Sequence, residues 1–193
     1  KGVICIGEAL RDQDFNPTLL SNKITQKWPV QLYSSYASTE MSTAFTECET
    51  FQGGHHHPEL IIVEVLDNEN KPVQQGETGE LVITTLGVEA MPLLRFKTGD
   101  IVQLHTDACQ CGRNSLRLGP VVGRKQHMIK YKGTTLYPPA MHDLLTSFEA
   151  IENHVIEIFT SDLGTDEILI KIVTTNNSEE FIHEVKNHFK AIL

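Results

Sequence analysis

The chain has 193 residues, enough for one large domain or two small ones, and its 40% hydrophobic content suffices for an ordinary buried core. Lys and Arg number 16 against 25 Asp and Glu, so the formal net charge is −9. This acidic balance, without a basic cluster, argues against nucleic acid or an anionic membrane as a partner. The longest apolar runs are strand-sized, short of the roughly 20 residues that cross a bilayer, so a globular, cytoplasmic protein is expected.

The first part of the chain predicts a strand-helix-strand unit. "GVICIG" (2–7) and "VQLYSS" (30–35) have the apolar character of short buried strands. A helix is expected to start after Asn16, with Pro17 in its first position. Its apolar residues recur at helical spacing, namely Leu20, Ile24 and Trp28. Strands joined through a helix run parallel, so this part predicts an α/β arrangement.

The middle of the chain, from residue 59 to residue 106, reads as one strand after another. Four strands are expected, at 59–67, 79–86, 92–100 and 101–106. This section predicts an antiparallel sheet or a small barrel, which would complete a large domain over residues 1–124.

The last part changes pattern again and predicts a small α+β domain over residues 125–193. Strands are expected in "HMIKYKG", "TTLYP", "HVIEIFTS" and "EILIKIVTT". One helix carries the apolar residues Met141, Leu144, Leu145 and Phe148. A final helix follows Asn177 and Ser178 and has an apolar face of Phe181, Ile182, Val185 and Phe189.

The segment "YASTE" (36–40) follows a predicted parallel strand, at the sheet edge where open α/β sheets bind ligands. Tyr36 offers a flat face for a base, and Ala37 is small enough for a ligand to approach the backbone. Ser38 and Thr39 offer hydroxyl donors to phosphate, and Glu40 offers an oxygen to a hard cation such as Mg²⁺. A Ser or Thr helix cap with Glu in the first turn is the alternative interpretation.

Two further residues could contact a nucleotide. Asp100 follows Gly99 between two predicted strands, where a carboxylate can accept two hydrogen bonds from a ribose diol. Thr-Gly-Asp is equally an ordinary hairpin turn. Arg124 lies at the predicted domain junction, where it could reach a nucleotide, although a solvent-facing basic strand is the alternative.

The cysteines suggest a metal site. Cys109 and Cys111 are too close in sequence to bridge each other easily, yet both can bind one ion. Cys48 and the run His55-His56-His57 could supply the remaining ligands. A tetrahedral Cys3His zinc site has no open position and is therefore structural. The alternative is three unrelated thiols and a solvated histidine run. Cys5 reads as a small buried side chain.

Taken in order, these segments resemble the adenylate-forming acyl-CoA synthetases, and most closely the phenylacetate-CoA ligase branch. The matching pieces are "IGEA", "YASTE", "GELVITTLGVEAMPLLRFKTGD", "CQCGR" and "GRKQHMIKYKGTTLYPP". The resemblance implies that a carboxylic acid, phenylacetate or another aryl acid, attacks the α-phosphate of Mg-ATP to give an acyl-adenylate. The thiol of coenzyme A then displaces AMP. A homodimer is also expected.

The resemblance implies roles for individual residues. The nucleotide site would contain Gly7, Glu8, Tyr36, Ala37, Ser38, Thr39, Asp100 and Arg124. Thr39 and Glu40 would be catalytic, the first holding phosphate and the second binding Mg²⁺. Gln126 would be the hinge of a C-terminal lid, and Lys132 and Gly133 would face coenzyme A. A structural zinc would be held by Cys48, His55, Cys109 and Cys111.

The chain departs from the family pattern in several places. Ala37 stands where glycine is usual, and Gln126 and His127 stand where acidic residues are common. A Ser/Thr/Gly-rich phosphate loop and the family's lysine near the end of the lid are absent. The chain is therefore expected to be a fragment, holding the back half of the large domain and most of the lid, with weak nucleotide affinity and negligible turnover. Two alternatives stay open: a zinc-stabilised binding module without catalysis, and an adenylating enzyme that loads a carrier protein or an amine.

Overall fold

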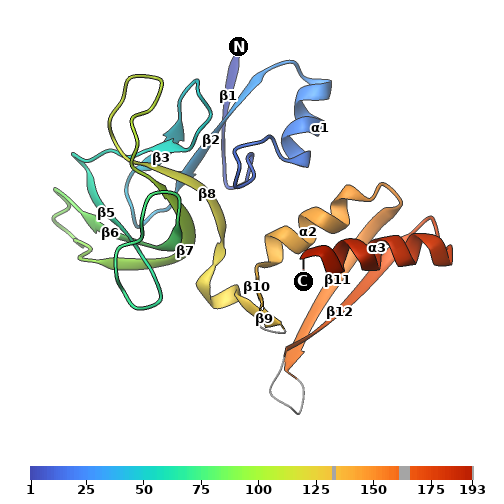
Figure 1. Cartoon of the computed structure of the whole chain (residues 1–193). Helices are drawn as coiled ribbons and strands as arrows, with labels where there is room; N and C mark the ends of the chain where they lie inside the picture. The colour runs from blue at the N-terminus through green and yellow to red at the C-terminus, as the bar shows by residue number, and fades with distance from the viewer. Residues whose placement is uncertain (132–133, 161–165, 193) are drawn as a thin grey trace. The chain divides into compact units, whose positions relative to one another are not determined.

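The structure is a computed structural model that describes residues 1–131, 134–160 and 166–192. The chain divides into two compact units, unit 1 (residues 1–125) and unit 2 (residues 126–193) (Figure 1). Within the described ranges, no helix has the length and apolar character needed to span a membrane.

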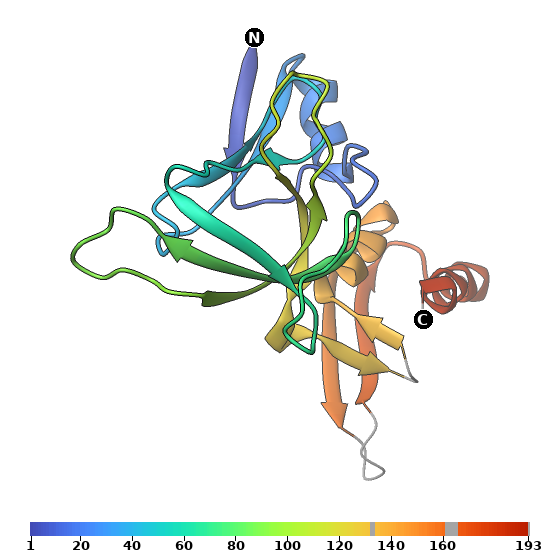
Figure 2. The same ribbon diagram turned by 60° about the vertical axis from the view of Figure 1, so that its left-hand side comes forward.

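Unit 1 is built on an eight-stranded sheet with the order β1-β2-β3-β4-β8-β7-β6-β5. The strands are β1 (Gly2–Ile6), β2 (Gln31–Ala37), β3 (Ala44–Glu47), β4 (Gly54–His55), β5 (Ile61–Leu66), β6 (Thr78–Thr85), β7 (Phe96–His105) and β8 (Arg117–Arg124). β1 and β2 run parallel, and every other neighbouring pair is antiparallel. The predicted combination of a parallel strand-helix-strand unit and an antiparallel sheet is confirmed, and Figure 2 shows how strongly the sheet twists from β5 to β8.

Helix α1 (Leu19–Lys27) connects β1 to β2 and begins later than predicted. Thr18 is the N-cap, because its side chain accepts a hydrogen bond from the backbone N–H of Ser21. Pro17 is not the first helical residue, since it forms an isolated antiparallel bridge with Arg11. The hydroxyl cap rather than the proline therefore sets the start of the helix.

The predicted turn at Thr98-Gly99-Asp100 is wrong, because β7 runs through it. Glu80 pairs with Ile101 and Val82 pairs with Lys97, so β7 advances four positions while β6 advances two. The additional residues form a bulge in which Gly99 has a φ of 78°, a value that favours glycine. Asp100 thus sits on a distorted part of a continuous strand, where bulges commonly redirect side chains.

Three strands were not predicted, and β8 is the most consequential of them. It contains Gly119, Pro120 and Gly123, residues that normally argue against a central strand. Pro120 lies at an irregularity of β8, because Val102 pairs with Val121 and Leu104 with Leu118, and prolines within sheets are found at such bulges. On the other side, β4 pairs only with Arg117 and Leu118. The core of unit 1 packs on this sheet and consists of Met41, Phe45, Ile61, Val65, Leu81, Ile83, Val102 and Leu118.

Unit 2 contains two hairpins and two helices. Its elements are β9 (Ile129–Tyr131), β10 (Thr134–Leu136), α2 (Pro138–Ser147), β11 (Ile151–Thr160), β12 (Asp166–Thr174) and α3 (Glu179–Ile192). β9 pairs with β10 and β11 pairs with β12, both antiparallel. The two helices contact each other, and α2 also contacts β11 (Figure 1). The core consists of Ile129, Leu136, Met141, Leu145, Phe181, Val185 and Phe189, as the predicted apolar helix faces require.

A histidine pair joins α2 to β11 and should make unit 2 sensitive to acid. His142 Nδ1 and His154 Nε2 are 2.7 Å apart, and this hydrogen bond requires at least one neutral ring. Burial, and then the neighbouring His142, lower the pKa of His154. The unfolded chain therefore binds the proton first, and stability present at neutral pH is lost as the pH falls through the unfolded value of about 6.5.

We expect hydrogen-exchange protection factors of the α2 amides to fall between about pH 7 and pH 5. The fall should be smaller in His154→Gln, whereas the exposed His183→Gln on α3 should behave as wild type. An identical pH dependence in the two variants would contradict the assignment.

Candidate functional site

The predicted nucleotide-binding segments meet at one edge of the sheet in unit 1. β1 and β2 are parallel with Ile6 opposite Ser35, so Gly7 and Tyr36 follow at the same edge. Gly7 has a φ of 91° and open space where a Cβ would lie, and Glu8 is exposed beside it. Gly7 and Glu8 are therefore accessible at this edge.

The chain turns sharply after β2. The backbone N–H of Met41 donates to the carbonyl of Ser38 at 3.3 Å, and the chain then enters β3 instead of a helix. The helix-cap interpretation of "YASTE" is therefore wrong. Ala37 and Ser38 are half-buried, whereas Thr39 and Glu40 lie in the turn with exposed side chains.

Asp100 is held by two side chains from other strands. The Tyr36 hydroxyl donates to Asp100 Oδ2 at 2.6 Å, and Arg124 Nε donates to Oδ1 at 3.1 Å. Asp100 and Arg124 are also direct partners across β7 and β8. The Thr98 hydroxyl accepts from the backbone N–H of Asp100 and donates to the carbonyl of Leu81, which supports the bulge. Both carboxylate oxygens thus have partners in the structure.

Charge couples these residues further. Burial, and then the hydrogen bond to Asp100, raise the pKa of Tyr36, so its phenol stays protonated and acts as a donor. The pKa of Glu40 is lowered, first by its own backbone N–H, then by the Ser38 hydroxyl, and also by the charge of Arg124. Tyr36, Asp100 and Arg124 therefore form one hydrogen-bonded constellation, and the charge of Arg124 also acts on Glu40 in the turn after β2.

The predicted hinge residue follows β8 and Lys125 in the chain. Gln126 is exposed in the short 3-10 helix η1 (Lys125–His127) and is the first residue of unit 2. Lys132 and Gly133 lie outside the described residues. The role of Thr98, whose hydroxyl bonds the backbone of Asp100 and Leu81, was not predicted, because in the sequence Thr98 is only a turn residue.

A second cluster contains Cys48, His55, Cys109 and Cys111, whose ligand atoms all lie within 4.8 Å of one another. Cys48 Sγ is 3.7 Å from Cys109 Sγ, and Cys111 Sγ is 3.5 Å from His55 Nε2. Ligand atoms around a tetrahedral zinc with Zn–S bonds of about 2.3 Å stand about 3.8 Å apart. The cluster therefore has the spacing of a four-ligand metal site. In the described part of the chain it is the single group of three or more such ligands.

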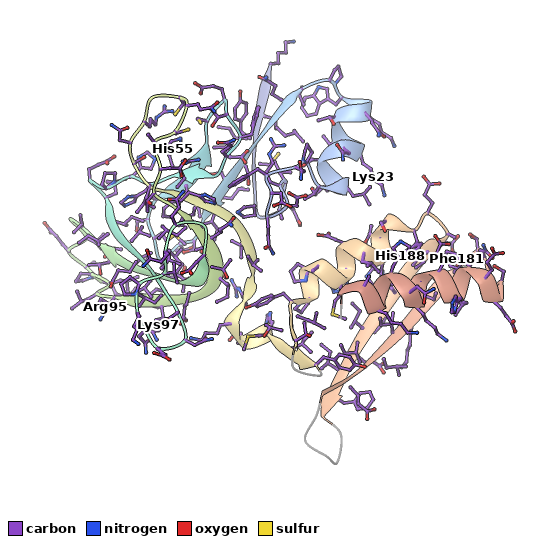
Figure 3. The ribbon with its side chains drawn as sticks, in the orientation of Figure 1. Lys23, His55, Arg95, Lys97, Phe181 and His188 are labelled. Carbon is purple, nitrogen blue, oxygen red and sulfur yellow. The ribbon has the colours of Figure 1, made fainter. Side chains whose placement is uncertain are left out.

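Strand pairing assembles this cluster from two loops. Cys48 follows β3 and His55 lies on β4, while Cys109 and Cys111 lie between β7 and β8. The second loop is closed by hydrogen bonds from the Cys109 N–H to the Arg113 carbonyl and from the Gly112 N–H to the Cys109 carbonyl. Figure 3 shows His55 at the opposite end of unit 1 from Lys97, so the cluster is remote from the start of β7.

Neighbouring hydroxyls orient the ligands. Ser115 Oγ lies 3.2 Å from His55 Nδ1, which leaves Nε2 facing Cys111. Burial, and then the charge of Arg113, lower the pKa of His55, which favours the neutral ring that metals bind.

The thiols differ, because burial raises the pKa of Cys48 whereas that of Cys109 is lowered. Burial opposes ionisation of Cys109, but hydrogen bonds from Thr50, the Cys111 backbone and the neighbouring thiols lower its pKa to about 7. Thr50 Oγ1 lies 3.1 Å from Cys48 Sγ and 3.3 Å from Cys109 Sγ. These supports were not predicted, because Thr50 and Ser115 carry no local signal in the sequence.

Arg117 ties the two loops together from inside the protein. It is 2% exposed. Its Nη1 donates to the Gln52 carbonyl at 2.6 Å, and Nη2 contacts Asp107 through the carbonyl at 3.2 Å and the carboxylate at 2.9 Å. One buried guanidinium therefore sets the distance between the loop holding Cys48 and the loop holding Cys109. Its only sequence signal was a charge between two leucines.

Curated relatives of the chain include phenylacetate-coenzyme A ligases. The enzyme of Thermus thermophilus is 36% identical over 141 residues, which are 72% of this chain and 31% of that protein. The enzyme of Escherichia coli is 27% identical over 139 residues, 72% of this chain and 30% of that protein. The chain thus spans about a third of the length of these relatives. No family model matches the sequence.

Solved structures share the fold. A 2-hydroxyisobutyryl-CoA ligase in complex with R3-HIB-AMP has a TM-score of 0.72 and 24% identity, over 97% of this chain and 40% of that one. The fold is therefore that of part of the adenylate-forming CoA ligases. In sequence, the chain is similar to the phenylacetate-coenzyme A ligases, which confirms the resemblance predicted from the sequence.

We expect Arg117→Met to lower the free energy of unfolding of unit 1 by about 2–4 kcal/mol, because several hydrogen bonds from a buried, charged donor to Gln52 and Asp107 are lost. Lys23→Met on the exposed face of α1 should change it by less than about 0.5 kcal/mol (Figure 3). Denaturant unfolding followed through Trp28 fluorescence measures both. Equal effects would show that Arg117 does not hold the loops.

Proposed function

We propose that the chain is part of an AMP-forming ligase that activates a carboxylic acid, phenylacetate or another aryl acid, and transfers it to coenzyme A. The observation that carries the proposal is the constellation of Tyr36, Asp100 and Arg124 with Glu40 at a parallel-strand edge. The curated relatives support the ligase class. A structure of the 2-hydroxyisobutyryl-CoA ligase holds 2-HIB-AMP and CoA, which supports an adenylate and a thiol as the reaction partners.

The residues of the constellation have complementary tasks in this proposal. The ring of Tyr36 stacks on adenine against Gly7 and Glu8, and the Asp100 carboxylate accepts hydrogen bonds from the ribose hydroxyls. Arg124 gives way to the ribose, because its side chain is 57% exposed and water can take over its hydrogen bonds. The freed guanidinium is then available to the nucleotide phosphate.

In this proposal, the turn after β2 binds the phosphates of the nucleotide. Ser38 and Thr39 offer hydroxyl donors, and Ala37 leaves the backbone accessible. The exposed Glu40 carboxylate, kept ionised by its low pKa, suits Mg²⁺, which neutralises charge on the phosphates when bound. Attack by the acid breaks the bond from the α-phosphorus to the leaving pyrophosphate, and fixed donors stabilise the negative charge that develops on the α-phosphoryl oxygens.

The second half-reaction needs the thiol of coenzyme A to reach the acyl carbonyl and expel AMP. We assign the hinge of the lid to Gln126 and the face toward coenzyme A to Lys132 and Gly133, by resemblance. Residues 1–124 would be the partial nucleotide-binding domain and residues 125–193 the partial lid. The cytoplasmic location, the homodimer and the inactivity of this chain alone stay predictions.

We expect this chain to bind AMP weakly, because it spans only part of the length of its relatives. The dissociation constant should be in the millimolar range, which corresponds to a binding free energy of about −4 kcal/mol. Asp100→Ala should abolish the binding, because the ribose loses its acceptor, while the exposed Asp14→Ala should leave it unchanged. Titration followed by NMR shifts of the Tyr36 and Asp100 amides measures it. Identical affinities for the wild type and Asp100→Ala would contradict the site, and no binding by any form would favour the metal-stabilised module without catalysis.

We further propose that the Cys3His cluster holds a structural Zn²⁺. Its four ligand atoms fit one tetrahedral ion, and the set leaves no open position for a reactant. Among the three histidines, His55 is buried and faces Cys111, whereas the ring of His56 bonds the carbonyl of Ile61 and that of His57 contacts Glu59. The neutral His55 ring is ready to bind at neutral pH.

Elemental analysis should find one zinc for each wild-type chain. His55→Ala should lose the metal and His57→Ala should keep it, which makes the second variant a matched control. Removal of the metal by a chelator should lower the midpoint of unfolding of unit 1, because binding energy is folding energy in such sites. A chain free of zinc even after refolding with the metal would remove the proposal.

A further inference from the structure

The end of unit 1 is held by two consecutive ion pairs. Arg124, the last residue of β8, pairs with Asp100, and Lys125, the first residue of η1, pairs with Glu80. Lys125 Nζ lies 2.8 Å from Glu80 Oε2. Unit 2 begins at the next residue, Gln126.

The two ion pairs lie on opposite faces of the sheet. Glu80 is paired with Ile101 across β6 and β7, so the two share a face. Glu80 is next to Leu81, a core residue, and therefore points away from the core. Asp100 is two positions from Val102, which also lies in the core, so Asp100 is on the core side of β7. The chain is thus fixed from both sides at the point where it leaves the sheet.

Glu80 is a buried carboxylate that takes no part in the chemistry proposed above. Its side chain is 7% exposed, and a buried charge is costly unless it has a partner. Lys97 is the alternative cation, but its Nζ is 3.8 Å away and also donates to Asn70. Lys125 is therefore the close partner, and the carboxylate dictates where Lys125 must stay.

We propose that Glu80 is a positioning residue that fixes Lys125, so that the connection between the two units begins at Gln126. The inference rests on the proposed function in one respect: it takes unit 2 as part of a lid that turns at Gln126, and it assigns Lys125 as the fixed residue before that hinge. Reorientation of unit 2 then starts after Lys125 and does not unravel β8.

The two pairs respond differently to a nucleotide. Asp100 is the proposed ribose acceptor, so a bound nucleotide competes with Arg124 for it. Glu80 is on the opposite face and is not offered to the ligand. The Lys125 anchor therefore persists when Arg124 is released, and the pivot keeps its place in both the free and the nucleotide-bound protein.

NMR relaxation of backbone amides tests the anchor on this chain. In the wild type, the order parameter of the backbone amide at position 125 should be near 0.85, the value of rigid backbone. It should fall below about 0.6 in Lys125→Met and in Glu80→Gln. Lys125→Arg keeps a cation and should stay near the wild-type value. Lys97→Met removes the distant partner of Glu80 and is the matched control, expected to leave Lys125 rigid.

An order parameter of Lys125 that stays unchanged in both Lys125→Met and Glu80→Gln would overturn the proposal, even if the variants are less stable. A purely stabilising ion pair would lower global stability without loosening this amide in the folded state. Addition of AMP should shift the signal of the Arg124 amide, because its side chain changes partner, while Lys125 stays rigid. Loosening of Lys125 on addition of AMP would also overturn the proposal. Absence of AMP binding would count against the nucleotide site alone, because the comparison without AMP still decides the anchor.

Discussion

The pairing of β8 with strands on both of its sides is the constraint on which both candidate sites depend. At its start, Arg117 and Leu118 pair with β4 and bring the Cys48–His55 loop beside the Cys109–Cys111 loop. At its end, Arg124 pairs with Asp100 on β7. A shift of one residue in this register would turn each of these side chains to the other face of the sheet.

Long-range charge pairs then give the strand ends their precise positions. Asp100 is drawn toward Tyr36 and Arg124 by the bulge around Gly99, and Arg117 spans two loops whose residues are about sixty positions apart in the chain. In both cases a group with little exposure accepts or donates hydrogen bonds that water cannot supply. Two arginines, Arg117 and Arg124, therefore help to position the two candidate sites.

Much of this organisation could be predicted from sequence, because periodicity and ligand type are local signals. The strand-helix-strand unit, the apolar faces of α2 and α3, and the Cys3His set are of this kind. β8 was missed because Gly119 and Pro120 normally mark loops, and they fit here at an irregular pairing with β7 that no local signal predicts. The bulge at Gly99 resembled a turn for the same reason, since glycine with positive φ serves both. Arg117 and Glu80 could not be assigned, because their partners lie on distant strands.

The two candidate sites lie at opposite ends of β8, seven residue steps or roughly 20 Å apart along the strand. Interactions separated by this distance, with no shared partners, generally contribute additively to stability. A substitution that changes stability at the phosphate end is therefore not offset by a change in stability at the cysteine loops. Such thermodynamic independence means that substitutions at the ligand-binding edge leave the stability contributed by the cysteine end unchanged.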